Sequence, residues 1–144
     1  MAGGDPFDLE RFVDAQRGVF DVACAELRGG RKTGHWMWFI FPQIAGLGLS
    51  AMSQRYAIGS LEEARAYLRH SILGLRLREI CGIVLAVEGR TALEVFGSPD
   101  DWKLRSSMTL FAHASEENAE FAAVLAKYFG GEWDQKTLEL MGLG

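Results

Sequence analysis

Apolar side chains recur every three or four residues along most of this chain, which is the spacing of one face of an α-helix. The first such segment covers residues 6–28, where an otherwise apolar face carries Gln16. Asp5 can cap a helix at this point, and Pro6 suits the first helical position because its missing N–H costs nothing there. Gly29 and Gly30 follow as a stop signal. The pattern therefore predicts one continuous helix over residues 6–28.

Capping residues and the same spacing predict further helices. Ser60 and Glu63 form a capping-box pattern at the start of one helix, which bends or breaks near His70. The next predicted spans are residues 73–87, 91–96, 99–112, 115–129 and 135–141, with Thr91, Pro99, Ser115 and Asp134 at the N-termini of the last four. Because every segment with a clear period is helical, we expect an all-α, compact multihelical single domain over residues 1–144, with residues 1–4 as a flexible tail.

Residues 35–41 are the exception to the helical period. Both alternating sets of side chains in this Trp-rich segment are largely apolar, so a strand buried on both faces and an irregular buried segment fit equally. We expect a buried extended or irregular piece. It lies within residues 33–54, which contain 22 consecutive positions without Asp, Glu, Lys or Arg. That is the length of a bilayer span, but Pro42, Gln43 and several glycines and serines favour a buried segment or the wall of a pocket.

Composition narrows the class of protein. Of the 144 residues, 49% are hydrophobic and 24% are charged, and the formal net charge is -4. These values exclude a disordered chain and disfavour a binder of nucleic acid, whose phosphates need a basic surface. Cys24 and Cys81 without a secretory leader indicate a reducing compartment, so we expect a soluble cytoplasmic protein that does not act at a membrane.

Two common ligand-binding motifs are absent from the sequence. Residues 29–34 contain glycines and a lysine, but Arg31 replaces the glycine that precedes the lysine of a phosphate-binding loop. A helix end with solvated basic residues explains them better. The histidines and cysteines lack the close spacing of zinc ligands. We therefore expect neither a metal nor a cofactor.

One predicted helix carries polar groups at the edge of its apolar face. Helical spacing places Asp100, Lys103 and Ser107 in a narrow sector, with Ser106 beside it. Lys103 is a fixed cation and the hydroxyls are hydrogen-bonding groups, which suits an anionic or sugar-like ligand. The alternative is an i,i+3 salt link on a solvated face.

Polar side chains also accompany the aromatic ones elsewhere. Gln16 needs hydrogen-bond partners if it is buried, so it is either a structural strut or a ligand contact. His35 and Gln43 flank Trp36 and Trp38, whose rings can stack on a ligand or pack in the core. We assign no catalytic residue. The candidate ligand-binding residues are Gln16, His35, Trp36, Trp38, Gln43, Asp100, Lys103, Ser106 and Ser107.

Four motifs together resemble domain of unknown function family 1810, an uncharacterised bacterial and fungal family. They are residues 11–16, residues 34–43 with the Gly-Leu-Gly at 46–48, residues 67–70 with residues 73–77, and residues 100–111. Some members carry a calpastatin label, which conflicts with a compact helical chain because calpastatin is disordered and built of repeats. The helical make-up is also similar to that of ADP-ribose-processing N-glycosidases. That similarity implies a nucleotide-like ligand and transfers no catalytic residue.

Three hypotheses follow for function. The first is a domain that binds, or binds and processes, a small polar or anionic ligand of the nucleotide or ADP-ribose type in an aromatic-lined pocket. The second is a protein–protein interaction module that docks through an exposed Trp-rich segment. The third is that the polar residues are only struts and surface groups. Exposed tryptophans favour the second hypothesis, whereas shielded tryptophans beside a polar cavity favour the first.

Overall fold

The computed structural model describes residues 4–143, and every regular element in that range is a helix. The helices are α1 (Glu10–Gln16), α2 (Phe20–Arg28), α3 (Met37–Ile40), α4 (Ala51–Arg55), α5 (Leu61–Arg69), α6 (Leu73–Ala86), α7 (Ala92–Phe96), α8 (Asp100–Ala114), α9 (Ala119–Phe129) and α10 (Gln135–Leu140). This confirms the predicted all-α class. Residues 1–3 of the expected tail lie outside the described residues. Within residues 4–143, none of the helices has the length and apolar character that crossing a bilayer requires.

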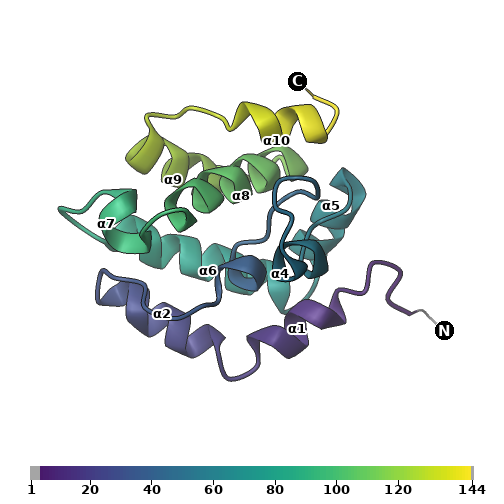
Figure 1. The fold of residues 1–144 in the computed structure, drawn as a ribbon, viewed down its shortest axis with the longest axis horizontal. Helices are drawn as coiled ribbons and strands as arrows, with labels where there is room; N and C mark the ends of the chain where they lie inside the picture. The colour runs from purple at the N-terminus through teal and green to yellow at the C-terminus, as the bar shows by residue number, and fades with distance from the viewer. Residues whose placement is uncertain (1–3, 144) are drawn as a thin grey trace.

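The helices surround one hydrophobic core. α5, α6, α8 and α9 pack against one another, α2 packs on α6, and α7 and α10 pack on α8. Figure 1 shows α1 and α2 on one side of α6, with α8, α9 and α10 on the other. A row of buried rings joins four helices, since Tyr67 contacts both Phe12 and Phe111 at centroid distances of 5.2 Å, and Phe111 contacts Phe121 at 6.0 Å.

Several of the predicted helix ends are confirmed. α5 ends at Arg69 and α6 begins at Leu73, so the break near His70 is present. Thr91 and Glu94 form a complete capping box, and Asp134 caps α10. At α5, the Ser60 hydroxyl accepts a hydrogen bond from Glu63 N as expected, but the Glu63 carboxylate binds Gly59 N and Arg11 instead of completing the box.

Two predicted helix boundaries are wrong. The span 6–28 is two helices, because the backbone turns at Gly18 with a φ of +73° and directs α2 away from α1. Helical spacing alone does not reveal such a turn, since apolar side chains continue on both sides of it. α9 begins at Ala119 and not after Ser115. The Ser115 hydroxyl instead accepts from Glu117 N in the preceding loop.

Most of the Trp-rich segment is buried, with His35 exposed and Trp38 half-buried, but residues 37–40 form a helical turn and not the extended or irregular piece that we expected. Gln16 Nε2 donates to Phe39 O at 2.8 Å, which satisfies a carbonyl at the end of this turn. The turn is apolar on nearly every side because other elements surround it, including α1. Burial on all sides removes the one-sided pattern by which helices are recognised.

The loop from Gln43 to Ile58, which contains α4, is closed at its base. Ala45 N donates to Ile58 O and Ile58 N donates to Gln43 O, both at 2.8 Å, which forms an isolated parallel bridge between Ile44 and Ile58. We call this segment the 43–58 loop. The bridge joins both ends of the loop, so the residues between them form a compact unit.

The guanidinium of Arg11 fixes this loop to the helices. It donates five hydrogen bonds, to two carbonyls before α1, to Arg55 O at 2.9 Å, and to Ala57 O and Glu63 Oε2 at 2.8 Å each. The side chains of Arg11 and Glu63 are only 12% and 8% exposed. Arg11 therefore connects α1, the 43–58 loop and α5 through all of its N–H groups.

We expect Arg11→Ala to lower the free energy of unfolding by about 3 to 5 kcal/mol, because it leaves the buried Glu63 carboxylate without its partner. Arg11→Lys is also destabilising, since one ammonium cannot replace the planar fork. Arg17→Ala is the matched control, because Arg17 pairs with Asp14 on the surface and such a pair contributes about 1 kcal/mol or less. Urea denaturation measures all three, and equal losses in Arg11→Ala and Arg17→Ala would contradict the assignment.

Candidate functional site

Two adjoining cavities lie where the 43–58 loop meets α8. One, of about 140 Å³, is formed within the loop and is closed on one side by Trp38. The other, of about 230 Å³, is lined by Gln43, Leu47, Gly48, Ser53, Pro99, Trp102, Lys103, Ser106 and Asp134. Gln43, Gly48 and Ser53 line both cavities. We call the two cavities together the loop–α8 cleft.

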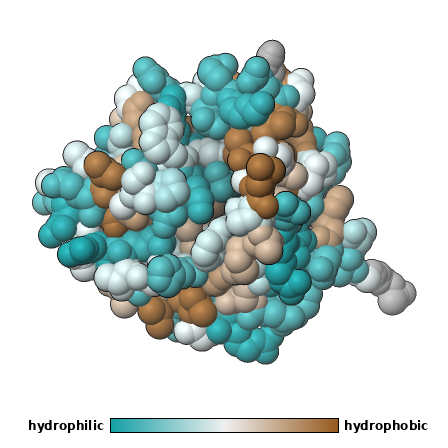
Figure 2. Space-filling model, in the orientation of Figure 1, coloured by the Kyte–Doolittle hydropathy of each residue, from teal (hydrophilic) through white to brown (hydrophobic). Residues whose placement is uncertain are grey.

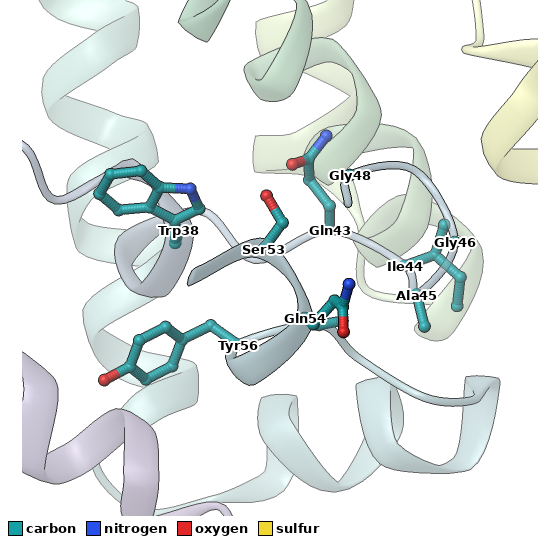
Figure 3. A pocket seen from close by; sticks show the side chains of 10 residues that line it. Trp38, Gln43, Ile44, Ala45, Gly46, Gly48, Ser53, Gln54 and Tyr56 are labelled. Carbon is teal, nitrogen blue, oxygen red and sulfur yellow. The ribbon is translucent and has the colours of Figure 1, made fainter. Parts of the chain in front are cut away.

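The 43–58 loop presents several hydrogen-bond donors to the cleft. Figure 3 shows Trp38, Gln43 and Ser53 around the first cavity, with the Trp38 indole nitrogen on the side of the ring that faces the other two. The Gln43 amide has no hydrogen-bond partner among residues 4–143, although its main-chain carbonyl is used in the bridge to Ile58. Ser53 Oγ accepts a hydrogen bond from Ser50 Oγ at 2.9 Å, so its own proton remains free to donate.

Gly48 allows the loop to fold tightly against α4. A Cβ atom at Gly48 would lie 2.5 Å from Ser53 Oγ, closer than nonbonded atoms approach. Ser50 caps α4, accepting a hydrogen bond from Ser53 N at 3.1 Å. The glycine and the cap together hold the Ser53 hydroxyl at the junction of the two cavities.

Lys103 shares its nearest anion, Asp100, with a second lysine. Its Nζ lies 3.6 Å from Asp100 Oδ1, whereas Lys32 Nζ lies 2.8 Å from Asp100 Oδ2, so Lys32 holds this carboxylate more closely. Lys103 Nζ lies 5.1 Å from the centre of the Trp38 ring, and it has no hydrogen-bond acceptor within the described part of the chain. Its side chain is 21% exposed. Two ammonium groups thus share the Asp100 carboxylate, so the charge of Lys103 is only partly balanced by this residue.

A chain of hydroxyls connects α8 to the start of α10. Ser106 Oγ lies 2.8 Å from Thr137 Oγ1, and the Thr137 hydroxyl donates to Asp134 Oδ2. Thr137 N donates to the same carboxylate oxygen at 3.1 Å, and Asp134 N donates to Thr109 Oγ1 at 2.9 Å. These bonds fix Ser106 and Asp134 in the wall of the second cavity.

The structure brings together only part of the predicted set. Trp38, Gln43, Lys103 and Ser106 line the cleft, and Asp100 contacts Lys103 at its edge. His35 is exposed and lines neither cavity. Ser107 is fully buried beneath the surface of α8, and its Oγ has no hydrogen-bond partner among residues 4–143.

Gln16 is placed as a strut and does not reach the cleft. Its Nε2 donates to Phe39 O at 2.8 Å and to the Tyr67 hydroxyl at 3.2 Å, and its Oε1 accepts from Arg76 at 3.2 Å. The side chain is 2% exposed. Gln16 thus connects α1, α3, α5 and α6, which explains a polar residue on an apolar helix face.

Trp36 also belongs to the core. Its ring is 2% exposed, and its indole N–H donates to Glu26 Oε1 at 3.0 Å. The same oxygen accepts from Thr33 N and Gly34 N at 2.8 and 2.9 Å. Lys32, which the sequence suggested to be solvated, has a 7% exposed side chain and lies over the Trp36 ring. These contacts leave no face of Trp36 open to a ligand.

Among the polar and aromatic residues of the cleft, sequence reasoning missed Ser53, Gln54, Tyr56, Trp102 and Asp134. Trp102 is 59% exposed and lines the second cavity, and its position next to Lys103 was an available signal. Ser53 lies in the uncharged stretch, where no local sequence pattern distinguishes it from the other serine. Asp134 was recognised only as a helix cap, because its proximity to α8 depends on the packing of α10.

Comparison with known proteins finds a family whose model matches the sequence and a solved structure with the same fold. The family model described as protein of unknown function (DUF1810) matches residues 6–141. The crystal structure of the conserved hypothetical protein Rv1873 from Mycobacterium tuberculosis is 57% identical and superposes with a TM-score of 0.95. The match covers 97% of this chain and 100% of that one. No curated protein matches the sequence.

The Glu26 contacts predict a pH dependence of stability. Burial opposes ionisation of Glu26, but the hydrogen bonds from Gly34, Thr33 and Trp36 outweigh it and lower its pKa from 4.5 to about 2. The contribution to stability is therefore complete above pH 4.5 and is lost as the pH falls towards 2. We expect Glu26→Ala to lower the free energy of unfolding at pH 7 by about 1 to 2 kcal/mol, allowing for partial exposure of the carboxylate.

Chemical denaturation between pH 2 and pH 7 measures this effect. The difference between wild type and Glu26→Ala should shrink as the pH falls through this range. Glu88→Ala removes an exposed carboxylate and serves as the control, with a small difference at every pH. A Glu26→Ala difference that stays constant down to pH 2 would show that the carboxylate is not held in this way.

Proposed function

The chain belongs to the DUF1810 family of proteins of unknown function, and we propose that it binds a small anionic ligand of the nucleotide type in the loop–α8 cleft. The observation that carries this proposal is that the Lys103 ammonium has no hydrogen-bond acceptor within residues 4–143. A partly desolvated ammonium needs a counter-charge or hydrogen-bond acceptors to offset its loss of water. Its nearest carboxylate, Asp100, is already paired with Lys32. A bound anion would supply the missing acceptors.

The other donors of the cleft support the same ligand class. The Gln43 amide, the Ser53 hydroxyl and the Trp38 indole belong to the wall of the first cavity, and Lys103 stacks on the Trp38 ring. Several donors around one space suit a group with several acceptor oxygens, such as a phosphate. Trp102, at the edge of the second cavity, offers a ring surface for the organic part of the ligand.

The competing hypothesis is an interaction module that docks through the Trp-rich segment. It has less support, because Trp36 and its neighbours Met37 and Phe41 are buried. Figure 2 shows hydrophobic residues gathered near the end of α10, where Leu140 packs on Gly46 of the loop. Exposed apolar side chains elsewhere in the protein, such as Leu49 at 84% and Leu143 at 52%, would have to replace the tryptophans as the contact surface. We therefore favour the ligand-binding function.

Lys103→Met tests the proposal, because methionine retains an apolar side chain over Trp38 and removes the charge. Isothermal titration with AMP and with inorganic phosphate should give an affinity that is about ten to a hundredfold weaker in Lys103→Met, which corresponds to one lost charge-assisted contact. Lys136→Met, on the exposed face of α10, is the matched control and should bind like wild type.

Thermal unfolding of the same variants separates binding from structure. If Lys103 serves the ligand, its removal leaves the melting temperature unchanged or raises it, since a poorly compensated cation costs stability. A fall in melting temperature with no change in affinity would identify Lys103 as a structural salt link instead. Absence of binding by wild-type protein to both AMP and phosphate would overturn the proposal.

A further inference from the structure

We propose that the loop–α8 cleft selects anions whose carbon skeleton also carries a hydroxyl group, the chemistry of a phosphorylated sugar or polyol. This inference rests on the proposed anion site and adds the recognition of a second group. It follows from the direction of the hydrogen bonds between Ser106, Thr137 and Asp134. These bonds determine which hydrogen-bonding partners this part of the wall can accept.

The protons in this series of hydrogen bonds can be arranged in only one way. A carboxylate has no proton to donate, so Asp134 Oδ2 accepts from both the Thr137 hydroxyl and Thr137 N. The Thr137 hydroxyl has a single proton, which this bond uses. The contact of 2.8 Å between Ser106 Oγ and Thr137 Oγ1 is therefore donated by Ser106. The Ser106 proton is directed at Thr137 and away from the cavity.

This part of the wall can consequently only accept hydrogen bonds from a ligand. Ser106 has lone pairs left, and Asp134 carries negative charge, and both residues line the second cavity. The main-chain N–H of Asp134 is used as well, because it donates to Thr109 Oγ1 at 2.9 Å. A ligand hydroxyl can donate here, whereas a phosphate oxygen would be repelled by Asp134.

The same cavity also contains groups that donate hydrogen bonds. Lys103 and the junction residues Gln43 and Ser53 offer donors, and they share a space of about 230 Å³ with Ser106 and Asp134. An anionic group satisfies the donors and a neighbouring hydroxyl satisfies the acceptors. Inorganic phosphate or a simple alkyl phosphate satisfies only the donors.

Glycerol 3-phosphate and propyl phosphate form a matched pair of probes, because they share the charge and the three-carbon chain and differ in hydroxyl groups. Isothermal titration of wild-type protein should show about tenfold tighter binding of glycerol 3-phosphate, the effect of one hydrogen bond to a partly charged acceptor. In Ser106→Ala and in Asp134→Asn the ratio of the two affinities should fall to about one. Asparagine remains a good helix cap, so Asp134→Asn keeps the start of α10.

The outcomes separate this inference from the proposed function. Equal binding of both probes by wild-type protein would overturn hydroxyl selection and leave the anion site standing. A preference that persists in Ser106→Ala and Asp134→Asn would also overturn it, because the hydroxyl would then be recognised elsewhere. If wild-type protein binds neither probe and no inorganic phosphate, the anion site itself fails, and the inference fails with it.

Discussion

The closure of the 43–58 loop by Arg11 is the constraint on which the site depends. This loop carries few groups that could hold it in place by themselves, because residues 33–54 contain no charged side chain. One guanidinium provides the anchor from outside, donating to the loop at Arg55 O and Ala57 O and to Glu63 on α5. The backbone bridge between Ile44 and Ile58 completes the closure. As a result, Gln43 and Ser53 lie at fixed positions opposite the polar residues of α8.

The cleft and the core differ in whether their polar side chains have hydrogen-bond partners. In the core, the buried Gln16 amide is satisfied by partners on three other helices, although the Ser107 Oγ has no partner among residues 4–143. In the cleft, the Lys103 ammonium and the Gln43 amide lack hydrogen-bond partners among residues 4–143. Both side chains are partly exposed, so solvent reaches these donors and a ligand can take the place of that solvent. The contrast between the two regions is the physical basis for assigning the ligand to the cleft.

Sequence reasoning predicted the elements whose signals are local. The all-α class, the caps at Thr91 and Asp134 and the break near His70 depend on neighbouring residues and are confirmed. Sequence reasoning failed where the position of a residue depends on tertiary packing. The turn at Gly18 interrupts a continuous apolar stripe, and Lys32 and Trp36 join Glu26 and Asp100 in a buried network that no spacing reveals. In the same way, Lys103 and Ser106 were predicted for the site, but the contribution of Ser53 and Asp134 depends on how the loop and α10 pack on α8.

The four tryptophans provide a direct test of where a ligand binds. Their indole N–H signals can be followed by two-dimensional NMR while AMP is titrated into the wild-type protein. The Trp38 signal should shift progressively to saturation, because its ring borders the cleft and contacts Lys103. The Trp36 signal should stay in place, since its N–H is held by Glu26 within the core. Saturable binding that leaves Trp38 unmoved, or that shifts Trp36 instead, would contradict a ligand site in the loop–α8 cleft.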